Sequence, residues 1–171
     1  MKKYIGTKTL LAKPMTRGDY DALQGWTITA NENPSDEGYL VEYLDGDKPN
    51  HRDFDHYISW SPKDVFERAY RPTTGMTFGL ALEALKQGKK VTRAGWNGRG
   101  MFLWLKPACT VQSDWCQDDV LKDICDSNGG EIFALGTICM FTHDSTGRKA
   151  ILTGWLASQS DMLLEDWEIV E

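Results

Sequence analysis

The residue types of a hydrolase triad occur side by side at one place in the sequence, His143-Asp144-Ser145. As consecutive residues of a predicted turn, they cannot converge on one substrate atom as a nucleophile, a base and an orienting acid must. No glycine-rich phosphate loop follows a predicted strand, and no pair of acids is placed for hydrolysis. We therefore expect no catalytic residues and no enzymatic activity.

Metal or redox chemistry is the next possibility that the residue types raise. His51, Asp53, Asp55 and His56 could supply metal ligands, but the surrounding sequence predicts a solvated loop and places no further ligand nearby. The four cysteines, at positions 109, 116, 125 and 139, have no CxxC spacing, so neither a zinc site nor a redox pair is indicated. We expect reduced thiols, no metal and no cofactor.

The strongest local pattern begins at Met76 and predicts a helix. Thr77 is a good N-cap residue because its hydroxyl can accept from a free amide of the first turn. Gly88 supplies the left-handed residue that ends a helix. The apolar stripe at helical spacing is formed by Phe78, Ala81, Leu82 and Leu85.

A β-hairpin is predicted directly after this helix. Its strands are expected at 91–96 and 101–105, joined by a two-residue turn at Asn97-Gly98. The return strand is apolar on both faces, with Leu103 on one face and Trp104 on the other. One face can cover the helix, and the other needs a ligand or a second subunit.

The rest of residues 76–171 reads as strands and short helices. Residues 107–131 form an inserted excursion with an acidic helix over 118–126, and a long strand over 132–142 returns over 149–155. Ser158 caps a short helix with Asp161 at its third position, and 167–170 closes the sheet. Residues 76–171 are thus predicted to form an antiparallel sheet of about five strands with a helix packed on one face.

The sequence predicts a small α+β unit over residues 1–71, and the polar stretch 71–75 is expected to be a linker. A helix is expected from Thr16 to Leu23, and strands over 39–44 and 56–60. Ser61-Pro62 is expected to start a second helix, with Ser61 as N-cap. Its buried stripe would contain Val65, Phe66 and Ala69. The expected fold class of the whole chain is α+β, with domains at 1–71 and 76–171.

The bulk composition is that of an ordinary globular protein, with 41% apolar and 26% charged residues in 171. No apolar run approaches the ~20 residues that a membrane helix needs, and the N-terminus lacks a signal-peptide core. We therefore expect a cytoplasmic protein without a membrane partner. The net charge of −6 argues against binding to DNA or RNA but permits a small anionic ligand.

Three blocks within residues 76–171 resemble the second Thoeris anti-defence family of phages. They are MTFGLAL at 76–82, GKKVTRAGWNGRGM at 88–101 and GWLASQSDMLLEDWE at 154–168. The blocks lie at both ends of this region, which is a little over half of the chain. Residues 1–71 resemble a module that precedes this domain in other phage and prophage proteins and has no assigned activity.

The resemblance implies a sponge rather than an enzyme. Family members bind cyclic ADP-ribose-type signals made by bacterial TIR-domain defence proteins and hold them without cleavage, and some also bind cyclic oligonucleotides. The resemblance further implies a homotetramer, a dimer of dimers, with each pocket between two protomers. The excursion at 107–131 departs in length from many members, so the choice of cyclic nucleotide stays open.

The residue types suit such a ligand. Nanomolar binding requires about −12 kcal/mol, whereas stacking one base on a ring contributes roughly 1–3 kcal/mol, so several contacts must act together. Aromatic rings can stack on adenine, cationic side chains (Lys90 among them) can bind a diphosphate, and polar groups can bind base edges and ribose hydroxyls. The candidate ligand-binding residues are Phe78, Arg93, Trp96, Asn97, Arg99, Trp155, Ser158, Gln159 and Asp161.

Each candidate also has a structural interpretation. Asn97 is explained by its hairpin turn, Ser158 with Asp161 by a capping box, and Trp155 by the core. Trp96, beside the turn, is the best single stacking candidate.

An alternative function is a phage accessory module that binds a protein and no nucleotide, with the first unit docking the partner.

Overall fold

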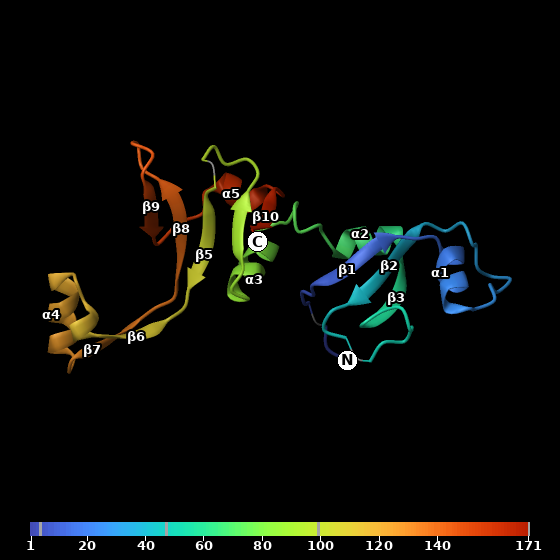
Figure 1. Ribbon diagram of the computed structural model, residues 1–171, viewed down its shortest axis with the longest axis horizontal. Helices are drawn as coiled ribbons and strands as arrows, with labels where there is room; N and C mark the ends of the chain where they lie inside the picture. Colours follow the sequence, from blue (N-terminus) through green and yellow to red (C-terminus); the bar gives the residue numbers. More distant parts are fainter. Residues whose placement is uncertain (4, 47, 99, 171) are drawn as a thin grey trace. The chain divides into compact units, whose positions relative to one another are not determined.

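The computed structural model describes residues 1–3, 5–46, 48–98 and 100–170 (Figure 1). The chain divides into two compact units, Met1–Arg71 and Pro72–Glu171. Helices and antiparallel strands occur in both units, which confirms the predicted α+β class. Within the described residues, no helix has the length and apolar character needed to cross a membrane.

The first unit is a three-stranded antiparallel sheet with two helices. Its strands, in the order β1-β2-β3, are β1 (Leu10–Pro14), β2 (Gly38–Tyr43) and β3 (Tyr57–Pro62), and its helices are α1 (Arg17–Gln24) and α2 (Lys63–Ala69). Thr16 caps α1 as predicted, its hydroxyl accepting from the Asp19 amide at 3.2 Å. Tyr20, Leu40 and Ile58 form the buried core. The sequence did not predict β1, whose residues are mostly exposed and show no alternation.

Two predictions for α2 are wrong. Ser61 is not its N-cap, because β3 continues through Ser61, which pairs with Tyr39 of β2, and Pro62 takes the N-cap position. No residue of α2 is buried either. Val65 is exposed, and Phe66 instead stacks on Tyr39 with ring centroids 4.2 Å apart. The short α2 packs on β2 and β3 through Phe66, and no side chain of the helix is fully buried.

The second unit contains the predicted antiparallel sheet of five strands, in the order β10-β4-β5-β8-β9 (Figure 1). Its strands are β4 (Lys90–Arg93), β5 (Phe102–Lys106), β8 (Thr137–His143), β9 (Lys149–Thr153) and β10 (Trp167–Val170). Helix α3 (Phe78–Lys86) packs on β4, β5 and β10, and the short α5 (Gln159–Leu163) packs on α3. The prediction of a helix covering one face is confirmed.

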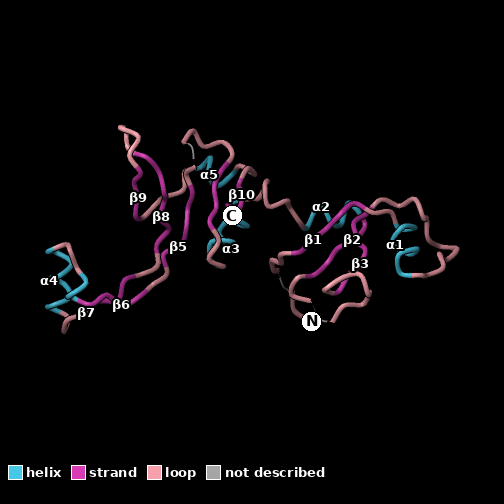
Figure 2. The backbone as a smooth tube through the Cα atoms, in the orientation of Figure 1, coloured by secondary structure: helices cyan, strands magenta, loops and turns pink. Residues whose placement is uncertain are grey.

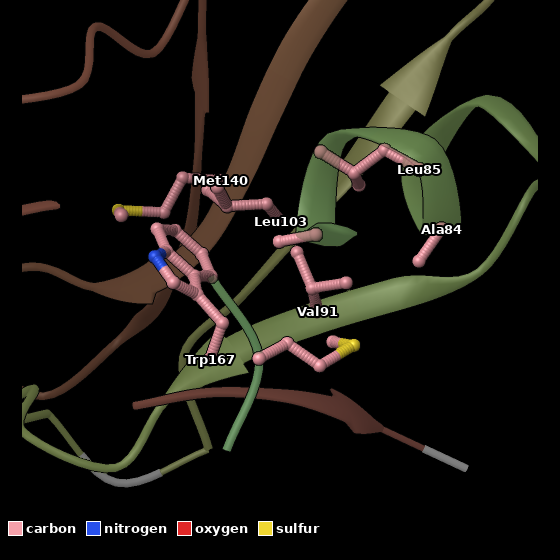
Figure 3. Close-up of a cluster of buried hydrophobic side chains, with 8 residues drawn as sticks. Ala84, Leu85, Val91, Leu103, Met140 and Trp167 are labelled. Atoms are coloured by element: carbon pink, nitrogen blue, oxygen red, sulfur yellow. The ribbon is translucent and has the colours of Figure 1, made fainter. Parts of the chain in front are cut away.

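The core of this unit lies between α3 and the sheet (Figure 3). Leu85 of α3 packs with Val91, Leu103, Met140 and Trp167 of four neighbouring strands. The predicted ends of α3 are confirmed by their local chemistry. The Thr77 hydroxyl accepts from the Leu80 amide at 3.3 Å, and Gly88 has a φ of 79°.

The predicted two-residue hairpin turn is wrong. A type I′ turn needs positive φ at both central residues, and neither Asn97 nor Gly98 has it. β4 ends at Arg93 and the connection to β5 spans residues 94–101. The segment before β10 binds the two residues after β4: the Asp166 carbonyl accepts from the Ala94 amide at 3.0 Å, and the Asp166 carboxylate accepts from the Gly95 amide at 3.1 Å. The Trp96 amide donates to the Arg93 carbonyl at 3.2 Å, so the chain turns directly after β4.

The predicted long strand over 132–142 is two strands that pair with different partners. β7 (Glu131–Ala134) pairs with β6 (Cys109–Gln112), whereas β8 pairs with β5. The β5–β8 ladder ends at Lys106, before Pro107, which has no amide to donate. We call residues 109–134 the arm (Figure 2).

The arm also carries two helices between β6 and β7. They are a 3-10 helix (Ser113–Trp115) and α4 (Asp119–Ser127), which packs on the 3-10 helix and on β7. The predicted acidic helix is confirmed, and the Asp118 carboxylate caps it by accepting from the Leu121 amide at 2.8 Å.

We expect residues 72–171 to fold without the first unit. The start at Pro72 matters because the Thr73 carbonyl accepts from the Ile169 amide at 3.0 Å, extending the edge beside β10. The fragment should be dispersed in solution and unfold cooperatively in denaturant. A matched fragment 76–171 lacks Thr73 and should be less stable by about 0.5–1.5 kcal/mol, the net value of one hydrogen bond. An aggregated or molten 72–171 fragment would contradict this division of the chain.

Candidate functional site

Four aromatic rings from distant parts of the second unit pack together. We call Phe78, Trp96, Trp155 and Trp167 the aromatic cluster. Trp167 is fully buried at its centre, with ring centroids 5.4 Å from Phe78, 5.5 Å from Trp96 and 6.1 Å from Trp155. The other three rings are half-buried. Trp96 and Trp155 meet at 6.0 Å and 63°, the edge-to-face arrangement that aromatic quadrupoles favour.

A buried ion pair lies directly beside the cluster. Arg93, only 7% exposed, donates from Nε and Nη2 to the two carboxylate oxygens of Asp166 at 2.7 and 3.0 Å. Its Nη1 donates to Oδ1 of Asp161 at 2.6 Å. The hydrogen bonds to Asp166 raise the pKa of Arg93 and lower that of Asp166, so both groups stay charged.

Asp161 connects the ion pair to the aromatic cluster. Its Oδ1 also accepts from Trp96 Nε1 at 3.1 Å, and its backbone carbonyl accepts from Trp167 Nε1 at 2.8 Å. The predicted capping box is present: Asp161 Oδ2 accepts from the Ser158 amide at 2.9 Å, and Ser158 Oγ accepts from the Asp161 amide. Burial would raise the pKa of Asp161, but hydrogen bonds from Ser158, Arg93 and Trp96 outweigh it and lower the pKa to about 2.

These contacts join six of the nine candidate residues into one group. The six are Phe78, Arg93, Trp96, Trp155, Ser158 and Asp161. Asn97 and Gln159 are exposed and follow Trp96 and Ser158 directly in the chain. Arg99 lies outside the described residues. Lys90 lies on the opposite face of the sheet, with its ammonium 5.4 Å from the Phe102 ring centroid.

The Arg93 side chain already has partners within the fold. Its Nε, Nη1 and Nη2 atoms each donate to a carboxylate, two of them to Asp166 and one to Asp161. These bonds fix the position of Asp161, and contact between Arg93 and a ligand stays a prediction. The sequence contains no signal for Asp166, because it lies 73 positions from Arg93 and no spacing rule connects them. Trp167, interpreted from the sequence as a core residue, is fully buried.

The other groups considered for chemistry are held in local structure. Asp144 closes its own turn, accepting from the amides of Thr146 and Arg148 at 2.9 and 3.0 Å. His51 Nδ1 accepts from the Asp53 amide at 3.2 Å, and its Nε2 lies 3.1 Å from the Leu23 carbonyl. In the part of the chain that the structure describes, no three His, Cys, Asp or Glu residues gather as metal ligands.

A hollow of about 450 Å³ belongs to the first unit. Its lining polar groups pair with one another: Lys63 donates to Glu37 at 2.7 Å, and the Tyr39 hydroxyl donates to Glu67 at 2.9 Å. The hollow is open to solvent, and these lining groups already have hydrogen-bond partners. We therefore take the aromatic cluster of the second unit as the candidate site.

The sheet, its covering helix and the aromatic cluster define the second unit as a small α+β domain. Residues 76–170 match a family model described as Thoeris anti-defense 2-like domain. The chain belongs to this family, which confirms the resemblance seen in the sequence. A protein of Bacillus phage SP01 named "Thoeris anti-defense 2" is 40% identical over 97 residues, covering 57% of this chain and 97% of that protein. The matched region leaves out the first unit.

Proposed function

We propose that this protein binds cyclic ADP-ribose-type signals made by TIR-domain defence proteins and sequesters them without cleavage in the host cytoplasm. The observation that carries the proposal is the family match over 76–170, together with the 40% identity to a phage protein named for Thoeris anti-defence. Other cyclic nucleotides belong to the same proposed ligand class. By this proposal the phage blocks the signal and leaves the host enzyme that makes it intact.

The chemistry of the site supports this proposal. Trp96 and Trp155 are half-buried, so part of each ring remains available to stack on a base. Asn97, Ser158 and Gln159 place polar groups at the surface beside these rings. Because Arg93 and Asp161 hold Trp96 and the start of α5 in place, little ordering is required on binding, which favours affinity.

We further propose that a second copy of the chain completes the pocket. Leu156 directly follows Trp155, and Leu163 is the last residue of α5. Their side chains are 88% and 75% exposed. Large apolar side chains gathered near one site commonly mark an interface. A shared pocket would also supply the several simultaneous contacts that tight binding requires.

Light scattering should therefore show a dimer or a tetramer. Leu156→Glu and Leu163→Glu should shift the protein toward monomer, because a carboxylate in an apolar contact is costly to desolvate. Leu11→Glu, at an exposed position of the first unit, is the matched control and should leave the mass unchanged. If the unaltered protein is strictly monomeric at micromolar concentration, the proposal that a second copy completes the pocket is wrong.

The ligand proposal is tested by purifying the protein from cells that produce the signal, denaturing it and analysing what is released. An intact cyclic nucleotide is the expected result. A linearised product would instead indicate an enzyme. Release of no nucleotide would favour the alternative, an accessory module that binds a protein partner.

A further inference from the structure

Two cysteines of the arm face each other. Cys116 follows the 3-10 helix and Cys125 lies in the last turn of α4, with their Sγ atoms 3.9 Å apart. Both are free thiols, and their nine-residue separation matches no redox motif. Cys125 is fully buried, whereas Cys116 is half-buried and is therefore the one that a small molecule reaches first.

The arm itself holds this arrangement. The Ser113 amide donates to the Gly130 carbonyl at 2.8 Å, and the Ser113 hydroxyl donates to the Asp126 carboxylate. The Cys116 amide donates to the Ser113 carbonyl at 3.1 Å. These bonds tie the 3-10 helix to the end of α4, so the two sulfurs stay close for as long as the arm is folded.

We propose that Cys116 and Cys125 are an oxidisable thiol pair, which closes to a disulfide when the protein meets a low-molecular-weight disulfide such as oxidised glutathione. A disulfide needs a sulfur separation of about 2.05 Å. The two sulfurs, now 3.9 Å apart, would have to move closer together. This movement gives up two weak contacts: Cys116 Sγ to the Gln112 carbonyl at 3.5 Å, and Cys125 Sγ to the Val111 carbonyl at 3.8 Å.

The reaction is two thiol–disulfide exchanges. The Cys116 thiolate attacks one sulfur of oxidised glutathione, the glutathione S–S bond breaks, and one glutathione thiolate leaves. The Cys125 thiolate then attacks the Cys116 sulfur of this mixed disulfide and displaces the second glutathione. Two protein thiols are oxidised, one glutathione disulfide is reduced to two thiols, and the two protein protons end on the departing thiolates.

The rate of the second exchange should respond to pH. Burial, and then the hydrogen bond with Cys116, raise the pKa of the Cys125 thiol. The nucleophile is the thiolate, so ring closure should accelerate as pH rises above the ordinary thiol range. At lower pH the mixed disulfide on Cys116 should persist longer.

The test uses the full chain, reduced and then incubated with oxidised glutathione. Free thiols are alkylated under denaturing conditions, and non-reduced peptides are mapped by mass spectrometry. We expect a Cys116–Cys125 cross-link within one chain, and Cys109→Ser should still form it. If Cys116 and Cys125 are both recovered alkylated while exposed Cys109 carries glutathione, the proposal is overturned.

Two variants separate the steps. Cys125→Ser should accumulate glutathione on Cys116, because the resolving thiol is gone. Cys116→Ser should leave buried Cys125 unmodified. Hydrogen exchange of the unaltered protein gives an independent measurement: oxidation should slow exchange over 113–130, since the disulfide joins the 3-10 helix to α4. Unchanged hydrogen exchange in a fully cross-linked sample would contradict the expectation that the disulfide stabilises the arm by joining the 3-10 helix to α4.

Discussion

Replacing Arg93 by methionine should lower the free energy of unfolding of the second unit by about 3–5 kcal/mol, the usual cost of removing one partner of a buried pair. Arg93 and Asp161 are 7% and 8% exposed and meet at 2.6 Å. Without the guanidinium, the Asp161 carboxylate stays in a poorly solvated place with no cation to offset it. Methionine retains the apolar length of the side chain, so the change removes the charge and the hydrogen bonds to Asp161 and Asp166 while keeping most of the packing.

A matched control is available on the same unit. Arg148 pairs with Asp144 at 3.3 Å, but its side chain is 84% exposed. Arg148→Met should therefore change the free energy of unfolding by no more than about 1 kcal/mol. Both variants are measured by urea unfolding at neutral pH. Equal, small effects would mean that the Arg93 pair is solvated like an ordinary surface pair.

The pH dependence gives a second check. The pKa of Asp161 is lowered from 3.8 to about 2 in the folded protein. Because the carboxyl has a lower pKa in the folded than in the unfolded protein, it stabilises the fold at pH values above the unfolded pKa of 3.8. This stabilisation is lost as the pH falls from 3.8 toward 2. Arg93→Met raises the folded pKa of Asp161, so the deficit relative to the unaltered protein should shrink over that window. A deficit of equal size at pH 7 and pH 3 would assign the loss to packing.

The sequence predicted those parts of the fold whose causes are local. Thr16, Thr77 and Ser158 each cap the helix that follows them, because a cap depends only on residues three positions away. The five-strand sheet was also predictable, since its strands carry their apolar pattern in short runs.

The errors arose where a distant residue decides the local structure. Asp166 binds the amides of the two residues after Arg93, where β4 was expected to continue, and neither Asn97 nor Gly98 has the positive φ of the expected turn. Pro107 ends the ladder of β5, and the strand opposite changes partner. Predicting the end of β4 or the change of partner opposite β5 would require knowing which strands are neighbours in the sheet. A short stretch of sequence does not contain that information.

The candidate site shows the same limit. Residue types alone selected Phe78, Trp96 and Trp155, which do come together. They could not show that Trp167 lies between them, or that Arg93 uses its donors on carboxylates. The carboxylate partners of Arg93 become visible only once the strands are placed beside one another.

Trp96→Ala should weaken binding of cyclic ADP-ribose by about 5- to 150-fold, corresponding to roughly 1–3 kcal/mol for one base stacked on a ring. Trp96→Phe should retain most of the affinity, because it keeps an aromatic ring for stacking, although it loses the Nε1 donor to Asp161 and one ring of the indole. Trp26→Ala is the matched control: Trp26 is 55% exposed in the first unit, so binding should not change. Calorimetric titration gives the three dissociation constants.

A thermal melt on the same samples separates the pocket from the core. Trp96 is half-buried and packs on Trp155 and Trp167, so its truncation should destabilise the fold. The loss should stay below the roughly 3–5 kcal/mol of a fully buried aromatic residue. Weakened binding by a protein that is still folded at the titration temperature places Trp96 against the ligand. A lowered melting temperature with unchanged affinity would make Trp96 a core residue and refute its stacking role.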